Sequence, residues 1–243
     1  MVYVPGIDGS GRLLLGTADL LAERFRLICI RYRTDHDAPA PADPYGALAA
    51  SVARCLEAAG VSRAVIVAES FGGAVAMRIA LDHPQRVAGL ALVNTFARYR
   101  ARLRLACARA ITPLVPGWVF RLSRRWFGWM FLFGWLREAA ACRDLVAVRL
   151  DGFPRDYARR LEMIAGLDLL PRLPELGQPV ALFASERDLV VRSVTLAREM
   201  QAALPDAELS LIPRGGHVVL PLLSLPWVDS LEKLCERAGL AAD

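Results

Sequence analysis

Lysine is almost absent from this sequence: Lys233 is the only one, so 29 of the 30 basic side chains are arginine. Long apolar runs are missing too, since the most apolar stretch, Trp126–Leu136, is about half the roughly 20 residues that a membrane-spanning helix needs. The first residues show neither a basic region followed by a long apolar run nor a small-residue cleavage site, so we expect no signal peptide. These absences predict a protein that neither crosses a membrane nor is secreted.

The cysteines are odd in number, far apart in the chain and free of any Cys-x-x-Cys pair: Cys29, Cys55, Cys107, Cys142 and Cys235. This usage is typical of a reducing compartment. We therefore expect a cytoplasmic protein, with peripheral contact to an anionic membrane left open. The composition, 55% hydrophobic and 23% charged over 243 residues, excludes a disordered tail, a collagen-like repeat and a disulfide scaffold.

Short apolar runs alternate with longer helical patterns, which predicts an α/β fold with a mostly parallel sheet flanked by helices. The expected strands are Val2–Val4, Phe25–Ile30, Ala64–Val67, Val87–Val93, Val180–Ala184 and Glu208–Ile212. The expected helices between them are Leu13–Arg24, Tyr45–Ala59 and Phe71–Leu81. Residues 96–175 break the alternation and are punctuated by proline and glycine, so we interpret them as a helical cap inserted into a core made of residues 1–95 and 176–243.

One of these strands runs directly into a tight turn and a helix, with the turn reading Ala68-Glu69-Ser70-Phe71-Gly72. This is a variant of the nucleophile elbow, with Ala68 where glycine is usual. Small residues two before and two after the serine let strand and helix pass closely. The turn would aim Ser70 off the carboxyl end of the strand and place the Phe71 N–H where it can stabilise an oxyanion. The alternative is a strand-to-helix turn that merely needed small residues.

Serine needs a base to act as a nucleophile, and the sequence offers three histidines. His36 lies in a loop of mixed charge and His83 precedes Pro84 at a helix end, so both are expected to be surface or capping residues. His217 follows Pro213-Arg214-Gly215-Gly216 directly after the last expected strand. It should therefore lie at the same sheet edge as Ser70.

The histidine in turn needs an acid to orient it. Asp188 stands four residues beyond the strand that ends at Ala184, far enough to turn toward this edge. Glu186 and Glu69 compete with it, and we prefer Asp188, with Glu186 in solvent.

The resulting chain order is Ser70, Asp188, His217, the order of nucleophile, acid and histidine in α/β-hydrolases. The sequence resembles that superfamily over nearly its whole length, through the AESFGG elbow, HPQRVAGLALVN, PVALFASERDLVV and the terminal GGH. The resemblance implies the α/β-hydrolase fold and acyl-transfer chemistry at a serine. It disfavours epoxide hydrolysis and dehalogenation, which use an aspartate nucleophile.

A glycine-rich loop, Pro5-Gly6-Ile7-Asp8-Gly9-Ser10-Gly11, follows the first expected strand. It lacks the phosphate-binding pattern of nucleotide-binding loops. It looks like the PGxDGTG loop of some lipid-ester hydrolases and acyltransferases, where this position supplies the second oxyanion donor. By position Ile7 N–H is that donor here, and Asp8 is expected to bond the loop amides. Pro5 replaces the histidine that often precedes this glycine.

The cap carries the charge asymmetry of the chain, with 15 arginines and seven acids in residues 96–175. Residues 98–137 hold nine arginines, no acid, and the aromatic residues Trp118, Trp126, Phe127, Trp129, Phe131, Phe133 and Trp135. One interpretation is packing of the aromatics on the core with arginines in solvent. The other is an apolar lid over an acyl chain whose basic rim attracts an anionic lipid surface or leaving group. Nucleic acid is not expected, because the aromatics form an apolar block.

The resembled superfamily usually has two strands before the one that carries the oxyanion loop. Here they are missing, so Phe25–Ile30 becomes a sheet edge that invites pairing. We expect either a longer reading frame upstream or a homodimer through this edge.

The leading hypothesis is a serine hydrolase of small-molecule carboxylic esters or thioesters, without cofactor or metal. Its alternatives are an acyltransferase with the same three residues and a hydrolase-like binding protein without activity.

Overall fold

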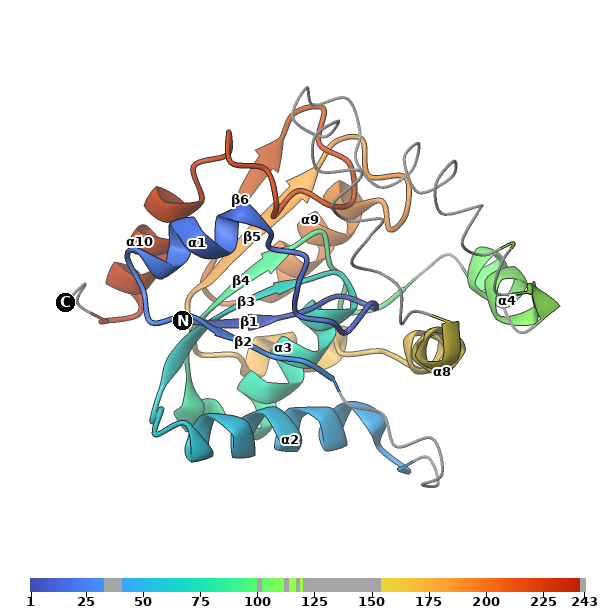
Figure 1. Cartoon of the computed structure of the whole chain (residues 1–243), viewed down its shortest axis with the longest axis horizontal. Coiled ribbons are helices and arrows are strands. Elements are labelled where there is room, and N and C mark those ends of the chain that lie inside the picture. Colours follow the sequence, from blue (N-terminus) through green and yellow to red (C-terminus); the bar gives the residue numbers. More distant parts are fainter. Residues whose placement is uncertain (33–40, 100–101, 112–113, 117–118, 120–153, 241–243) are drawn as a thin grey trace.

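A six-stranded parallel sheet forms the centre of the molecule in the computed structural model, which describes residues 1–32, 41–99, 102–111, 114–116, 119 and 154–240 (Figure 1). The strands are β1 (Val2–Val4), β2 (Ile28–Cys29), β3 (Ala64–Glu69), β4 (Val87–Val93), β5 (Val180–Ser185) and β6 (Ala207–Ile212). They lie in the order β2-β1-β3-β4-β5-β6, and all five pairings are parallel. The parallel sheet agrees with the sequence prediction, and β2 forms one of its edges.

Helices cover both faces of this sheet. The described helices are α1 (Gly16–Ala22), α2 (Pro44–Ala58), α3 (Phe71–Asp82), α4 (Arg102–Ile111), α8 (Pro154–Ala165), α9 (Ser193–Ala203) and α10 (Trp227–Arg237), with 3-10 turns η1 (Pro84–Arg86) and η4 (Leu170–Glu175). One buried cluster joins α2, α3 and α9 to one face, and a second joins α1 and α10 to the other. Figure 1 shows the three layers.

The central strands agree best with the sequence pattern because they are buried on both faces and therefore read as continuous apolar runs. Every residue of β3, β4 and β5 is buried. The helices expected at Tyr45–Ala59 and Phe71–Leu81 differ by one residue at most at each end. Helices α9 and α10, which no sequence pattern singled out, complete the two layers.

The largest differences lie at the sheet edge. The strand expected over Phe25–Ile30 contains only Ile28 and Cys29, because its sole neighbour is the three-residue β1, which pairs with just these two residues. The helix expected from Leu13 begins at Gly16, because the preceding Leu15 has a φ of 50°, outside the helical range.

Residues 96–175 leave the sheet after β4 and return to it before β5. Their two ends are joined: Arg98 and Asp168 form an antiparallel bridge, and the Leu169 N–H donates to the Ala97 carbonyl at 2.9 Å. Between these ends, α4 and α8 pack against each other beyond the carboxyl ends of the strands (Figure 1). None of the described helices has the length and apolar character required to span a bilayer.

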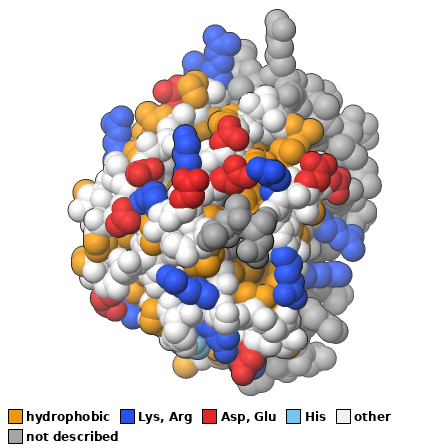
Figure 2. Space-filling model, turned by 90° about the vertical axis from the view of Figure 1, so that its left-hand side faces the viewer, with side chains coloured by type: hydrophobic (Ala, Val, Ile, Leu, Met, Phe, Trp, Pro, Cys, Tyr) orange, Lys and Arg blue, Asp and Glu red, His pale blue; other side chains and the backbone are white. Residues whose placement is uncertain are grey.

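The opposite end of the molecule is seen in Figure 2, where acidic and basic side chains are intermingled with small apolar areas. No large field of one sign forms among the described residues on that face. The buried polar side chains of Asn94, Asp188 and His217 lie instead after the carboxyl ends of β4, β5 and β6.

Candidate active site

The turn between β3 and α3 places Ser70 at the carboxyl end of the sheet. Ser70 has a φ of 51°, a left-handed conformation that is strained for a residue with a side chain. Three hydrogen bonds hold its backbone. Its N–H donates to the Val93 carbonyl at 3.0 Å, and its carbonyl accepts from Thr95 Oγ1 at 2.6 Å and from the Gly73 N–H at 3.0 Å. The strained turn therefore presents a partly exposed hydroxyl at a fixed place.

Small residues around Ser70 allow the close packing that this turn requires. A Cβ at Gly72 would lie 2.3 Å from the Pro5 carbonyl oxygen, and one at Gly73 would lie 2.1 Å from Thr95 Oγ1. Ala68 is fully buried. The strand, the helix and the glycine-rich loop thus meet in a space that larger side chains cannot share.

The structure brings His217 to this serine. Its Nε2 lies 2.9 Å from Ser70 Oγ, and its Nδ1 lies 2.9 Å from Asp188 Oδ2. An ionised carboxylate only accepts hydrogen bonds, so Nδ1 must carry the proton and Nε2 of the neutral ring accepts from the serine hydroxyl. The ring is therefore set to receive a proton from Ser70.

Asp188 is the carboxylate that contacts the histidine, whereas the competing Glu186 is exposed. The Oδ1 atom of Asp188 accepts from the backbone N–H groups of Val190 at 2.8 Å and Val191 at 3.1 Å. The other carboxylate oxygen, Oδ2, therefore accepts from His217. The side chain of Asp188 is fully buried.

Burial and charge compete in this pair. Burial alone raises the pKa of Asp188, but the imidazole and the two amides outweigh it and lower that pKa below 3.8. Burial alone lowers the pKa of His217, but the Asp188 carboxylate outweighs it and raises that pKa above 6.5. The net shifts strengthen the basicity of the imidazole.

Asn94 was missed at the sequence level, although it is the only asparagine in the chain. Its buried amide lies at the end of β4 with a φ of 45°. The amide nitrogen donates to Ser185 Oγ at 2.9 Å and to the carbonyls of Gly216 and His217 at 3.0 and 2.8 Å. The amide oxygen accepts from the Ser185 N–H at 2.8 Å. Asn94 thus ties the histidine loop to the ends of β4 and β5.

Two backbone N–H groups remain available for an oxyanion. Phe71 begins α3, where the first amides have no intrahelical acceptor. In the described part of the chain the Ile7 N–H also makes no hydrogen bond. Asp8 bonds its own loop as expected, accepting from the Ser10 N–H at 2.8 Å and from the Ser10 hydroxyl.

Glu69 was considered only as a rival acid, and it lies elsewhere. It is buried beneath the glycine-rich loop, where its carboxyl group accepts from the Tyr3 hydroxyl and from the Gly6 N–H. Burial raises the pKa of Glu69 to about 7. Glu69, which precedes Ser70 in the chain, is therefore only partly ionised near neutral pH.

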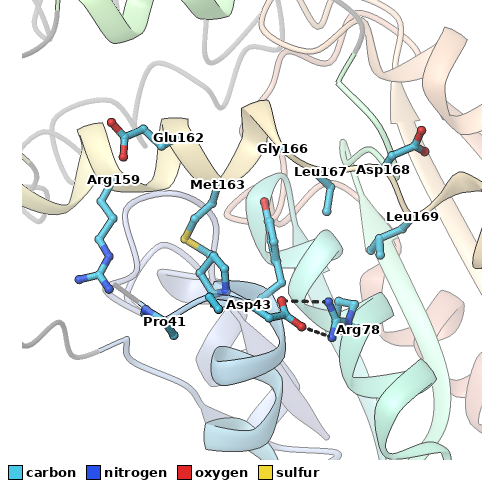
Figure 3. A pocket seen from close by; sticks show the side chains of 13 residues that line it. Pro41, Asp43, Arg78, Arg159, Glu162, Met163, Gly166, Leu167, Asp168 and Leu169 are labelled. Atoms are coloured by element: carbon cyan, nitrogen blue, oxygen red, sulfur yellow. Dashed lines mark hydrogen bonds and ion pairs between the residues drawn. The ribbon is translucent and has the colours of Figure 1, made fainter. Parts of the chain in front are cut away.

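A cavity of about 500 Å³ is lined by residues of α2, α3 and α8 and by the segment that follows α8, and not by Ser70, Asp188 or His217. Figure 3 shows Arg159, Glu162 and Met163 above the ion pair of Asp43 and Arg78. A smaller cavity of about 290 Å³ is lined by Tyr99, Val190 and Val191, next to the Asp188 turn. Among the described residues no group of histidine, cysteine and acidic side chains is arranged to hold a metal ion.

Two sets of residues singled out in the sequence lie outside the described residues. They are His36 and the aromatic block of the cap, Trp118, Trp126, Phe127, Trp129, Phe131, Phe133 and Trp135. His83 ends α3 as expected, its N–H donating to the Ile79 carbonyl at 2.8 Å.

Comparison with known proteins agrees with the fold described above. The family model for the alpha/beta hydrolase fold matches residues 1–119. RutD of Shigella flexneri serotype 5b, for which carbamate hydrolysis is the suggested activity, is 27% identical over 227 residues, covering 89% of this chain and 84% of the relative. The esterase RhEst1 from Rhodococcus sp. ECU1013 superimposes with a TM-score of 0.77 at 21% identity, over 99% of this chain and 90% of the other. The enol-lactonase from Burkholderia xenovorans LB400 gives 0.73 at 19% identity, over 98% and 89%.

Proposed function

Because the chain belongs to the α/β-hydrolase superfamily, we propose that it is a serine hydrolase that cleaves carboxylic esters or thioesters through an acyl-enzyme. The observation that carries the proposal is the pair of hydrogen bonds that links Ser70, His217 and Asp188. The distance is 2.9 Å both from Ser70 Oγ to His217 Nε2 and from His217 Nδ1 to Asp188 Oδ2. Such a hydrogen-bonded arrangement activates a serine hydroxyl, which is otherwise a poor nucleophile.

In the proposed reaction Ser70 Oγ attacks the carbonyl carbon while its proton moves to His217 Nε2. Asp188 stabilises the imidazolium that forms. The bond from the carbonyl carbon to the leaving oxygen or sulfur then breaks, and the leaving group takes the proton from Nε2. A water molecule repeats the sequence: it gives a proton to Nε2, its oxygen bonds to the acyl carbon, and Ser70 Oγ departs with that proton.

The tetrahedral intermediate places a negative charge on the former carbonyl oxygen. We propose that the N–H groups of Phe71 and Ile7 donate to this oxygen. Each such donor contributes about 3 kcal/mol to lowering the barrier in comparable sites. Residues 96–175 would cap the site, since Arg98, four residues after Asn94, is bridged to Asp168, and α4 and α8 lie in the segment between them.

A carbamate is the second candidate substrate class, and the relatives named RutD favour it. Its carbonyl carbon is open to the same attack by a serine. Comparing turnover of a phenyl ester and a phenyl carbamate that share one leaving group would rank the two classes.

A fluorophosphonate probe tests the proposal directly, because it forms a stable bond only with an activated serine. We expect labelling of the wild-type protein and none of Ser70→Ala or His217→Ala. The exposed Ser62→Ala and the half-buried His83→Ala are the matched controls and should label normally. Labelling that persists in Ser70→Ala would refute the assignment of the nucleophile. A labelled protein that transfers the acyl group to an added alcohol faster than to water would instead be the acyltransferase.

A further inference from the structure

The glycine-rich loop that carries Ile7 is held by side chains from distant parts of the chain. The Tyr32 hydroxyl donates to the Pro5 carbonyl at 3.0 Å, and the Tyr32 N–H donates to the Gly9 carbonyl at 2.9 Å. A turn closes between them through the Gly9 N–H and the Gly6 carbonyl at 3.1 Å. Ile7 and Asp8 are the two central residues of this turn.

One further bond to the turn comes from the cap segment. Arg160 of α8 donates from Nη1 to the Ile7 carbonyl at 2.7 Å across 153 residues of sequence. The arginine is only 5% exposed, and its guanidinium carbon lies 5.3 Å from the centre of the Tyr32 ring. A partly buried, charge-assisted hydrogen bond whose donor also lies over an aromatic ring is both strong and directional.

Gly9 is shaped to this arginine. Its φ is 66°, and a Cβ there would lie 2.6 Å from Arg160 Nη1. The guanidinium therefore fills the space where any other residue would carry its side chain. The Arg160 guanidinium and the glycine-rich loop are therefore in close contact at Gly9.

We propose that Arg160 is a positioning residue that fixes the direction of the Ile7 N–H toward the oxyanion. Ile7 lies between glycines at positions 6 and 9, and glycine leaves the backbone free to rotate. Anchoring the Ile7 carbonyl fixes the peptide plane after Ile7, while the bond from the Gly9 N–H to the Gly6 carbonyl fixes the plane before it, which carries the Ile7 N–H. The two contacts together limit the conformations of Ile7. A contact from residues 96–175 thereby adds to the core contacts that hold this loop. This inference rests on the proposed hydrolase function.

The test compares Arg160→Met with Arg159→Met, because Arg159 is the preceding residue of α8 and faces the cavity beside Asp43 (Figure 3). For a short phenyl ester we expect Arg160→Met to lower kcat at least tenfold with KM changed less than twofold. Arg159→Met should match the wild type. Arg160→Lys keeps the charge without the planar fork and should recover part of kcat.

A second readout separates positioning from loss of structure. A trifluoromethyl ketone forms a tetrahedral adduct that needs the oxyanion donors, so its affinity should fall with kcat across the series, while the acid limb of the pH profile stays in place. If Arg160→Met does not fold, Gly9→Ala displaces the guanidinium without removing it and should give the same loss of kcat. If Arg160→Met and Arg159→Met have equal kcat and the fluorophosphonate labels both, the positioning role of Arg160 is refuted while the proposed hydrolase function stands. Failure of labelling in the wild type would overturn the proposed function instead.

Discussion

The two halves of the candidate site are held in place by different parts of the chain. Asp188 and His217 lie in short turns after β5 and β6, and Asn94, at the end of β4, binds the histidine turn from within the sheet. The oxyanion loop follows β1 but depends on Tyr32, Glu69 and Arg160, of which the last lies in the cap segment. The proposed acid–base half is thus built by residues outside 96–175, whereas the proposed oxyanion half also uses Arg160 from that segment.

The largest expected effect falls on the acid–base half. Asp188→Asn replaces an acceptor with an amide that can donate to Nδ1 and so favours the wrong tautomer of His217. We expect kcat for an ester to fall by about 10⁴-fold, with the fold intact. Glu186→Gln, an exposed change in the same turn, is the control. Activity within tenfold of the wild type in Asp188→Asn would exclude Asp188 as the orienting acid.

Gly72→Ala tests the contact between the nucleophile turn and the oxyanion loop. The added Cβ would lie 2.3 Å from the Pro5 carbonyl oxygen, so the loop must move. We expect a loss of about 3 kcal/mol in the free energy of unfolding, measured in urea, together with a lower kcat. A Cβ at Gly177 meets nothing within 4 Å, so Gly177→Ala should leave both unchanged. Equal stabilities of the two variants would mean that the close approach is not required.

Asn94→Gly removes the side-chain amide that joins β4, β5 and the turn containing His217. Glycine tolerates the φ of 45° at this position, so the substitution adds no backbone strain. Four buried hydrogen bonds are lost, and we expect the free energy of unfolding to fall by about 2 kcal/mol, with a lower kcat. Gln201→Ala, which loses one long, exposed hydrogen bond, should have no effect. A stable Asn94→Gly variant with normal kcat would show that the core does not need this clamp.

Glu69→Gln is expected to have the smallest effect on catalysis, and this effect is seen through the pH dependence of activity. The Glu69 carboxylate contributes to the raised pKa of His217, so its removal should move the acid limb of kcat/KM to lower pH by less than about one unit. The folded-state pKa of Glu69, about 7, lies above its ordinary value of 4.5. Its contribution to stability is therefore complete below pH 4.5 and is lost as pH rises through 7.

The free energy of unfolding of the wild type should accordingly decline over this range by up to about 3 kcal/mol relative to Glu69→Gln. Thermal unfolding of both proteins at pH 5 and pH 8 measures this difference. Parallel curves would mean that Glu69 ionises freely in the folded protein.

The sequence was most informative where one local pattern determines the geometry. The strand–turn–helix pattern around Ser70 and the turns after β5 and β6 could be read in order along the chain, and their residues meet as expected. Asn94, Tyr32 and Arg160 could not be found this way, because each acts through a contact between segments distant in sequence. The strand at β2 was predicted, but its length was overestimated, since the length of an edge strand depends on its neighbour and not on its own β-branched residues.

The bridge between Arg98 and Asp168 makes the cap segment an exchangeable module. The chain leaves and re-enters the core at nearly the same point, so residues can be added or removed between these two positions without displacing β4 or β5. Substrate range could then diversify by replacing this one segment while the acid–base residues stay as they are. A replacement segment would still have to present an arginine to the Ile7 carbonyl, and this requirement would set the limit on such exchange.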